Sequence, residues 1–230
     1  MQTEIKYRPS YSMALVELEP SEEIRVEAAS MVSMSQDVTL ETKAAGGLLS
    51  SLKRSLLGGE SFFVNLYRAS DEGGRVTLAP ALPGDMIALQ RSGRSDLLVQ
   101  SGAYVASESG IEVDTAWGGA KTFFASEGLF LLRCSGMGQL ILSSYGAIHE
   151  IELNDGERYT VDTGHLVAFE EELDFNVRAV GGLKSTLFSG EGLVVDLTGP
   201  GKVWMQTRST DALLTWLIPR VQKELYNRQG

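Results

Sequence analysis

The sequence predicts an all-β fold of three quasi-repeats, built as β-sandwich or short double-stranded β-helix modules, with a short inserted helix and a C-terminal helix. The first observation is a stretch that begins at Val26 and recurs at Val99 and Val161. The second is that apolar and polar residues alternate near the end of each copy, the period-two pattern of a strand with one buried face. Like apolar residues follow the three valines at the same spacing: Val32, Val38 and Leu40; Val105, Ile111 and Val113; Val167, Leu173 and Phe175. Self-similarity of this kind predicts a repeat architecture.

Composition excludes some classes of function. The 230 residues carry 30 acidic and 20 basic side chains, a net charge of -10, which argues against a nucleic-acid partner. Cys134 is the only cysteine, so no disulfide can form within the chain, and a reducing compartment is expected. No stretch approaches the roughly 20 apolar residues of a membrane span. We therefore expect residues 1–230 to form a single compact unit in the cytoplasm.

The first copy is preceded by a predicted strand from Tyr11 to Leu18 and followed by an insertion. The leucines of Leu48–Leu57 recur at helical spacing, with Lys53 and Arg54 to one side. This pattern predicts a short amphipathic helix. We favour a helix that caps the β core over one that touches a second subunit or a lipid surface.

Three glycine-turned hairpins lie between and after the copies, at residues 62–78, 130–142 and 193–207. We expect each of the first two hairpins to belong with the copy that follows it. This grouping gives quasi-repeats at 60–119 and 127–182, and a third made of 190–208 combined with 11–47. The last hairpin would then lie beside the first copy, and the chain would close on itself, which protects sheet edges.

The C-terminal sequence predicts a helix over residues 209–229, capped by Thr210 or Asp211. Its leucines and Val221 form an apolar stripe. Packing across the β core is favoured over an oligomer contact. Pro219 is expected to kink or interrupt the helix.

No convergent catalytic set is apparent. His149 and His165 are the only histidines, and the sequence has no paired-histidine motif typical of a cupin metal site. We therefore expect no metal and no cofactor. A cupin-like small-molecule or metal-dependent enzyme stays open as an alternative.

The last hairpin carries the candidate binding residues. Alternation places Lys202, Gln206 and Arg208 on the same face as Trp204. An aromatic ring flanked by amide and cationic groups could form an anion-binding or subunit-contact patch. The alternative is that Trp204 packs under the C-terminal helix while the polar residues hold loops.

Residues 189–195 and 198–208 resemble the signature of an uncharacterised bacterial and archaeal family, similar to the mitochondrial biogenesis proteins named for altered inheritance of mitochondria. Residues 58–63 and the Pro83-Gly84-Asp85 turn support the resemblance. The signature turns contain Gly190, Glu191, Gly192, Gly199, Pro200 and Gly201. The resemblance implies a fold like that of the tryptophan RNA-binding attenuation protein, and self-association, with a trimer favoured. It implies no activity, and RNA or tryptophan binding is not carried over because fold does not determine function.

These observations together predict a non-enzymatic, self-associating scaffold or binding protein whose ligand the sequence does not identify. One alternative is the cupin-like enzyme. A second is a membrane-associated assembly factor that uses the Leu48–Leu57 insertion.

Overall fold

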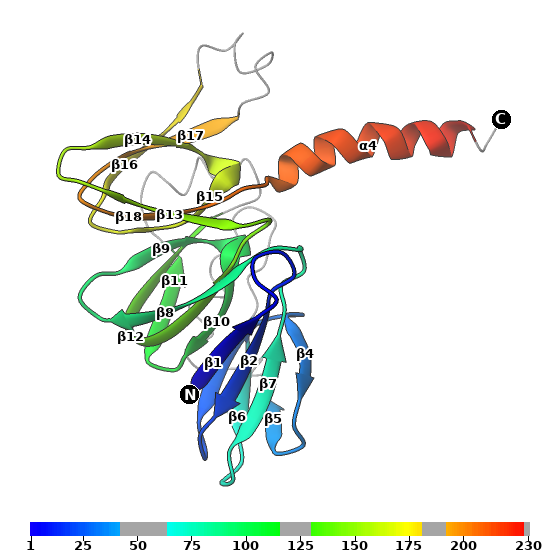
Figure 1. Ribbon diagram of the computed structural model, residues 1–230, viewed down its shortest axis with the longest axis vertical. Helices are drawn as coiled ribbons and strands as arrows, with labels where there is room; N and C mark the ends of the chain where they lie inside the picture. Colours follow the sequence, from blue (N-terminus) through cyan, green and yellow to red (C-terminus); the bar gives the residue numbers. More distant parts are fainter. Residues whose placement is uncertain (42–63, 116–129, 181–191, 228–230) are drawn as a thin grey trace.

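The protein is mostly β, with one α-helix among the residues described by the computed structural model, which are 1–41, 64–115, 130–180 and 192–227. Strands and helix are coloured along the chain in Figure 1. The strands are β1 (Gln2–Lys6), β2 (Met13–Leu18), β3 (Glu23–Glu27), β4 (Met31–Met34), β5 (Val38–Glu41), β6 (Val64–Ala69), β7 (Gly74–Leu78), β8 (Met86–Ser92), β9 (Leu97–Gln100), β10 (Tyr104–Glu108), β11 (Ile111–Thr115), β12 (Leu131–Ser143), β13 (Ile148–Leu153), β14 (Arg158–Asp162), β15 (Leu166–Glu170), β16 (Asp174–Ala179), β17 (Leu193–Thr198) and β18 (Gly201–Gln206). The α-helix is α4 (Thr210–Asn227), and short 3₁₀ helices η2 (Ser101–Ala103) and η4 (Thr163–His165) precede β10 and β15.

The strands fall into three sets that share one pairing pattern. In the first set β6 pairs with β3 and β5, while β7 pairs with β2 and β4. In the third set β17 pairs with β14 and β16, while β18 pairs with β13 and β15. In the second set the long strand β12 serves both roles, pairing with β9 and β11 in its first half and with β8 and β10 in its second. The like spacing of the three sequence copies therefore corresponds to like strand pairing.

Irregularities recur at the same place in each set. The ladder shifts register between Met31 and Ser33, between Tyr104 and Ala106, and between Leu166 and Ala168. These pairs follow Val26, Val99 and Val161 at the same distance in the sequence. A β-bulge bends and twists a strand, so the three sets share a local bend as well as a pairing order.

Neighbouring sets join through their strands. The first strand of one copy pairs antiparallel with the second strand of the next, as β3 with β10 and β9 with β15. The sets stack in order along the long axis, and α4 leaves from the third set (Figure 1). Each set contributes most of one buried apolar cluster, centred on residues such as Val76, Leu140 and Val203. Burial of these faces, at about 25 cal/mol per Å², is the main force holding the stack together.

The pairing corrects the expected grouping of the hairpins. Each hairpin completes the copy before it, because β6, the first half of β12, and β17 pair directly with β5, β11 and β16, the last strands of those copies. Consecutive elements of a chain usually lie side by side, and the hairpins follow this local preference. The last hairpin pairs with β13 to β16, so it does not lie beside the first copy, and the sheets of the described residues are open.

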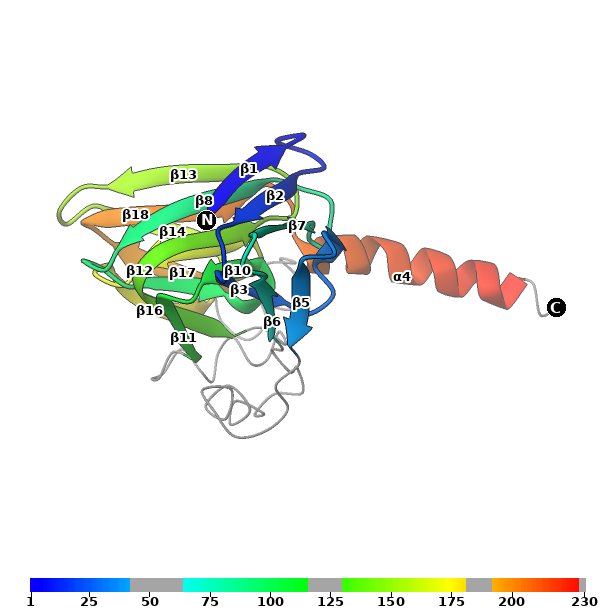
Figure 2. The ribbon, with the colours of Figure 1, turned by 90° about the horizontal axis from the view of Figure 1, so that it is seen from below.

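The helix α4 also differs from expectation. It projects away from the strands in both ribbon views (Figures 1 and 2) and does not pack across the β core. It begins after Ser209, whose Oγ accepts a hydrogen bond from the Ala212 N–H at 3.4 Å. Pro219 lies inside the helix without interrupting it. The expected helix at Leu48–Leu57 lies outside the described residues.

Candidate functional site

The predicted patch on β18 is organised by Glu150, a residue of β13 opposite Trp204 in the ladder. One carboxylate oxygen accepts a hydrogen bond from Lys202 Nζ at 2.6 Å, and the other accepts one from Trp204 Nε1 at 2.8 Å. The hydrogen bond from Lys202 is the main cause that lowers the pKa of Glu150. Trp204 itself is buried among core residues that include Val99 and Ala168. The donors of Lys202 and Trp204 are therefore directed at a carboxylate of this chain.

Gln206 and Arg208 do not join this group. The Gln206 side chain donates to Gly164 O at 2.8 Å and accepts from Tyr145 N at 2.8 Å, so it holds two loops together. Arg208 follows the end of β18, is exposed, and donates to the carbonyl of its neighbour Thr207. The structure thus brings Lys202 and Trp204 together through Glu150. Alternation along β18 could not identify Glu150, because its position opposite Trp204 depends on the register between β13 and β18.

The signature turn has a packing role. A Cβ on Gly199 would lie 2.2 Å from the Asn154 carbonyl oxygen, and one on Gly201 would lie 2.5 Å from the Leu173 side chain. The Gly199 N–H donates to Glu157 O at 2.9 Å. Gly201 also has a φ of 147°, a region that favours glycine. Gly199 thus lets this turn pack directly against the turn at 154–157, and Gly201 lets it pack against Leu173. Gly192 is described but exposed, while Gly190 and Glu191 lie outside the described residues.

The Pro83-Gly84-Asp85 turn contains a buried carboxylate. Asp85 is 2% exposed and accepts hydrogen bonds from Arg8 Nε at 2.8 Å, Arg8 Nη2 at 3.0 Å, Ser12 Oγ at 3.2 Å and the Met86 N–H at 2.8 Å. Burial raises the pKa of Asp85, but these hydrogen bonds and the charge of Arg8 together hold it below its ordinary value. Both carboxylate oxygens accept hydrogen bonds from groups of this chain, which is typical of a structural ion pair.

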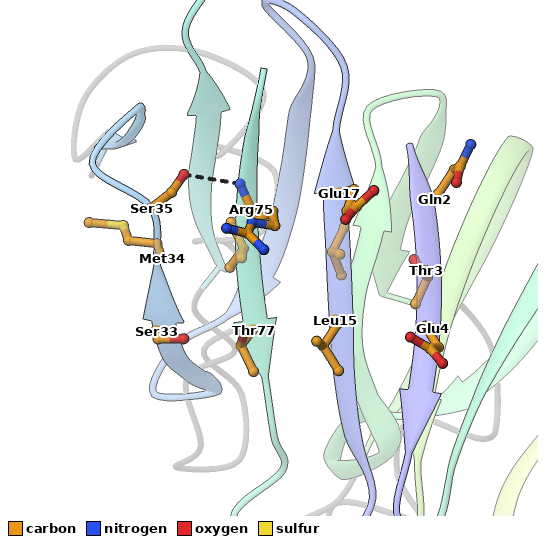
Figure 3. Close-up of a pocket in the computed structure, with 12 residues that line it drawn as sticks. Gln2, Thr3, Glu4, Leu15, Glu17, Ser33, Met34, Ser35, Arg75 and Thr77 are labelled. Carbon is orange, nitrogen blue, oxygen red and sulfur yellow. Dashed lines mark hydrogen bonds between the residues drawn. The ribbon is translucent and has the colours of Figure 1, made fainter. Parts of the chain in front are cut away.

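A hollow lies on the sheet formed by β1, β2, β7 and β4 (Figure 3). Its volume is about 490 Å³. Glu17 and Arg75 lie on it beside small hydroxyl side chains, and Ser35 Oγ accepts a hydrogen bond from the Arg75 N–H at 3.1 Å. Thr3 Oγ1 is buried without a hydrogen-bond partner among the described residues. The hollow offers polar contacts of both charge signs, but no nucleophile paired with a base.

Two strand edges expose apolar residues, and this is the feature that sequence reasoning missed. Val32 and Met34 on β4 are 56% and 41% exposed, and Tyr159 on β14 is 42% exposed. Their counterparts in the other copies, Val105, Val167, Ser107, Phe169, Ile24 and Leu97, are all 0% exposed. Those counterparts lie on β3, β9, β10 and β15, the strands that join neighbouring sets. Within the described residues, β4 pairs only with β7, and β14 pairs only with β17.

The two histidines and Cys134 have different surroundings. His149 is exposed on β13, and His165 Nδ1 donates to Gln206 O at 2.8 Å. Burial raises the pKa of the Cys134 thiol to about 12. Among the described residues, no three His, Cys, Asp or Glu side chains gather as a possible metal site. In the same part of the chain, no helix has the length and apolar character needed to cross a membrane.

Comparison with known proteins places the chain in a family. The family model described as "Mitochondrial biogenesis AIM24" matches residues 3–208. The chain belongs to the AIM24 family. The matched region of this AIM24 chain ends directly before α4. The family resemblance that the sequence motifs indicated is thereby confirmed.

Two bacterial proteins resemble this AIM24 chain over most of its length. An uncharacterised protein of Streptococcus pyogenes serotype M6 is 30% identical over 205 residues, covering 86% of this chain and 82% of the relative. The crystal structure of a Streptococcus pyogenes protein has a TM-score of 0.80 and 28% identity, and it covers 95% of this chain and 99% of that one. Neither relative is described by an activity.

Proposed function

We propose that this AIM24-family protein is a non-enzymatic, self-associating scaffold of the cytoplasm, whose copies join head to tail through β4 of one copy and β14 of the next. The contact would repeat between chains the antiparallel pairing that joins β3 to β10 and β9 to β15 within the chain. The exposed Val32, Met34 and Tyr159 carry this proposal, because their counterparts are buried at those internal junctions.

The register of the proposed contact follows from the internal junctions. Val26 lies opposite Ala106, and Val99 lies opposite Ala168. Val161 is the third valine of this series, and Ser33 occupies the place of the two alanines. Ser33 of one copy would therefore lie opposite Val161 of the next, with Ser35 opposite Tyr159.

A closed ring would leave no copy with a free edge at this contact. Unpaired edges promote uncontrolled association, and a head-to-tail contact forms a ring whenever its rotation closes. We propose a trimer, in accord with the family resemblance. We further propose that each set is a small β-sandwich quasi-repeat, with a fold like that of the tryptophan RNA-binding attenuation protein.

Light scattering on purified protein tests this proposal. At micromolar concentration the wild-type chain should be trimeric, whereas Met34→Lys and Tyr159→Lys should be monomeric because each places a charge inside the strand contact. Met137→Lys is the matched control, since Met137 is 67% exposed and lies on neither edge. Circular dichroism should show a folded β protein in all four samples. A monomeric wild type, or trimers that persist in both edge variants, would overturn the proposal.

Metal analysis tests the non-enzymatic part. The purified chain should contain no stoichiometric transition metal. A metal that His149→Ala or His165→Ala removes would favour the cupin-like enzyme instead.

A further inference from the structure

The helix α4 exposes a continuous apolar stripe. Every side chain from Leu214 to Tyr226 is exposed, so this part of the helix makes no close packing with the strands. The stripe consists of Leu214, Leu217, Ile218, Val221 and Leu225, whose exposed fractions lie between 38% and 56%. A surface helix normally buries such a stripe. The projecting helix therefore presents the face that would ordinarily be covered.

An isolated helix of this kind is poorly stable in water. Isolated helices shorter than about 12–15 residues are marginal in water, and although α4 has 18 residues, its interior proline destabilises it by about 3 kcal/mol. The continuous helix thus calls for a partner along its stripe. Pro219 is compatible with one, because it precedes Val221 by two residues, or about 200° of rotation, and so lies on the face away from the stripe.

The spacing within the stripe favours a second helix of the same kind as the partner. Leu214, Ile218, Val221 and Leu225 follow one another by four, three and four residues, which is the a/d pattern of a coiled coil. A lipid surface is less suitable, because Arg220 and Lys223 on this helix are balanced by Asp211 and Glu224, and helices that bind membranes usually have a strongly basic polar face.

We infer that α4 packs through this stripe against α4 of a neighbouring copy of the chain. The inference rests on the proposed head-to-tail assembly. The head-to-tail strand contacts would bring one α4 from each copy into the same particle, where the stripes can meet. Two heptads are short for an independent coiled coil, so the strand contacts must hold the copies together at high effective concentration.

Disulfide cross-linking of the full-length chain tests the inference. Val221→Cys puts a thiol on the stripe, while the matched control Gln222→Cys puts one on the next residue, about 100° around the helix. Cyclic symmetry brings like residues of the helices together, and a disulfide needs Cα atoms within about 7 Å. Under mild oxidation Val221→Cys should form linked pairs at least tenfold faster than Gln222→Cys. Cys134, which is 1% exposed, should not contribute.

The outcomes separate this inference from the proposed function. A wild-type trimer in which Val221→Cys cross-links no faster than Gln222→Cys would overturn the helix contact and leave the edge contact intact. A monomeric wild type would overturn both. Flotation of the wild-type chain with liposomes, lost in Ile218→Asn, would assign the stripe to lipid and also overturn the helix contact. Preferential cross-linking that Tyr159→Lys abolishes would support both levels of assembly.

Discussion

Asp85 provides a sharp test of how the turn at residues 83–85 is held. Asp85→Asn keeps the shape of the side chain but removes its charge and one acceptor oxygen. The four hydrogen-bond donors that now face the carboxylate come from Arg8, Ser12 and the Met86 N–H. Whichever way the amide turns, its NH₂ group faces at least one of these donors. A donor of Arg8, or those of Ser12 and Met86, then loses its acceptor, and the remaining hydrogen bonds from Arg8 are no longer made to a charged group; both effects contribute to the expected loss.

The magnitude follows from which donors can reach water. Arg8 is half exposed and can be rehydrated, whereas Ser12 is 4% exposed. Hydrogen bonds to charged groups contribute about 1.5–3 kcal/mol each, so we expect Asp85→Asn to lower the free energy of unfolding by about 2–4 kcal/mol at pH 7. The lowered pKa of Asp85 contributes stability that is present above the unfolded pKa of about 3.9 and is lost as the pH falls through the folded pKa. The difference in free energy of unfolding between Asp85→Asn and wild type should therefore become smaller below about pH 4.

Urea unfolding measures this difference, with all samples at one protein concentration because association shifts apparent stability. Asp155→Asn is the matched control, since Asp155 is exposed in a turn and should change stability by no more than about 0.5 kcal/mol. A loss at Asp85→Asn that is no larger than the control, or one that stays constant into strong acid, would refute the role given to the buried carboxylate.

Two further predictions concern Glu27 and Gly199. Burial raises the pKa of Glu27 to about 7, although a hydrogen bond from Ser30 acts to lower it. Ionisation of Glu27 therefore destabilises the fold, increasingly so between about pH 4.5 and 7. Glu27→Gln should be more stable than wild type by about 1–3 kcal/mol at pH 8 and equally stable near pH 4. Urea titrations at the two pH values check this, and a pH-independent difference would contradict it. Gly199→Ala should lower the free energy of unfolding by about 1–3 kcal/mol through overpacking. The control Gly102→Ala, whose added Cβ meets nothing within 4 Å, should leave the melting temperature nearly unchanged. Equal melting temperatures for the two variants would count against the packing role of Gly199.

Much of the fold could be predicted from spacing alone. Fully buried residues alternate with less buried ones along strands such as β2 and β3, and this alternation gives the period-two pattern that identifies a strand with one buried face. The amphipathic pattern predicts the C-terminal helix to within two residues of its observed ends at 210 and 227. The hairpin grouping was wrong because the position of a hairpin between two copies is equally compatible with pairing to either. Register and neighbour choice depend on which apolar faces are covered in space.

The candidate site was predictable only in part. Lys202 and Trp204 do share a face, as alternation requires, but their common partner Glu150 comes from another strand. The exposed edge residues could not be recognised as such, because Val32 and Tyr159 occupy the same repeat positions as fully buried residues. Sequence alone does not reveal which copy stands at the end of a stack.

The order of residues along the chain was sufficient to predict the mostly β class, the terminal helix and the family, and it contains a recurrent spacing of apolar residues, because each of these depends on local periodicity or on a continuous motif. Which strand pairs with which set, which edges stay uncovered and where α4 points depended on the folded chain, since these follow from contacts between residues distant in sequence. Burial of Val105 and exposure of Val32 differ only because one has a neighbouring set beside it and the other, among the described residues, does not.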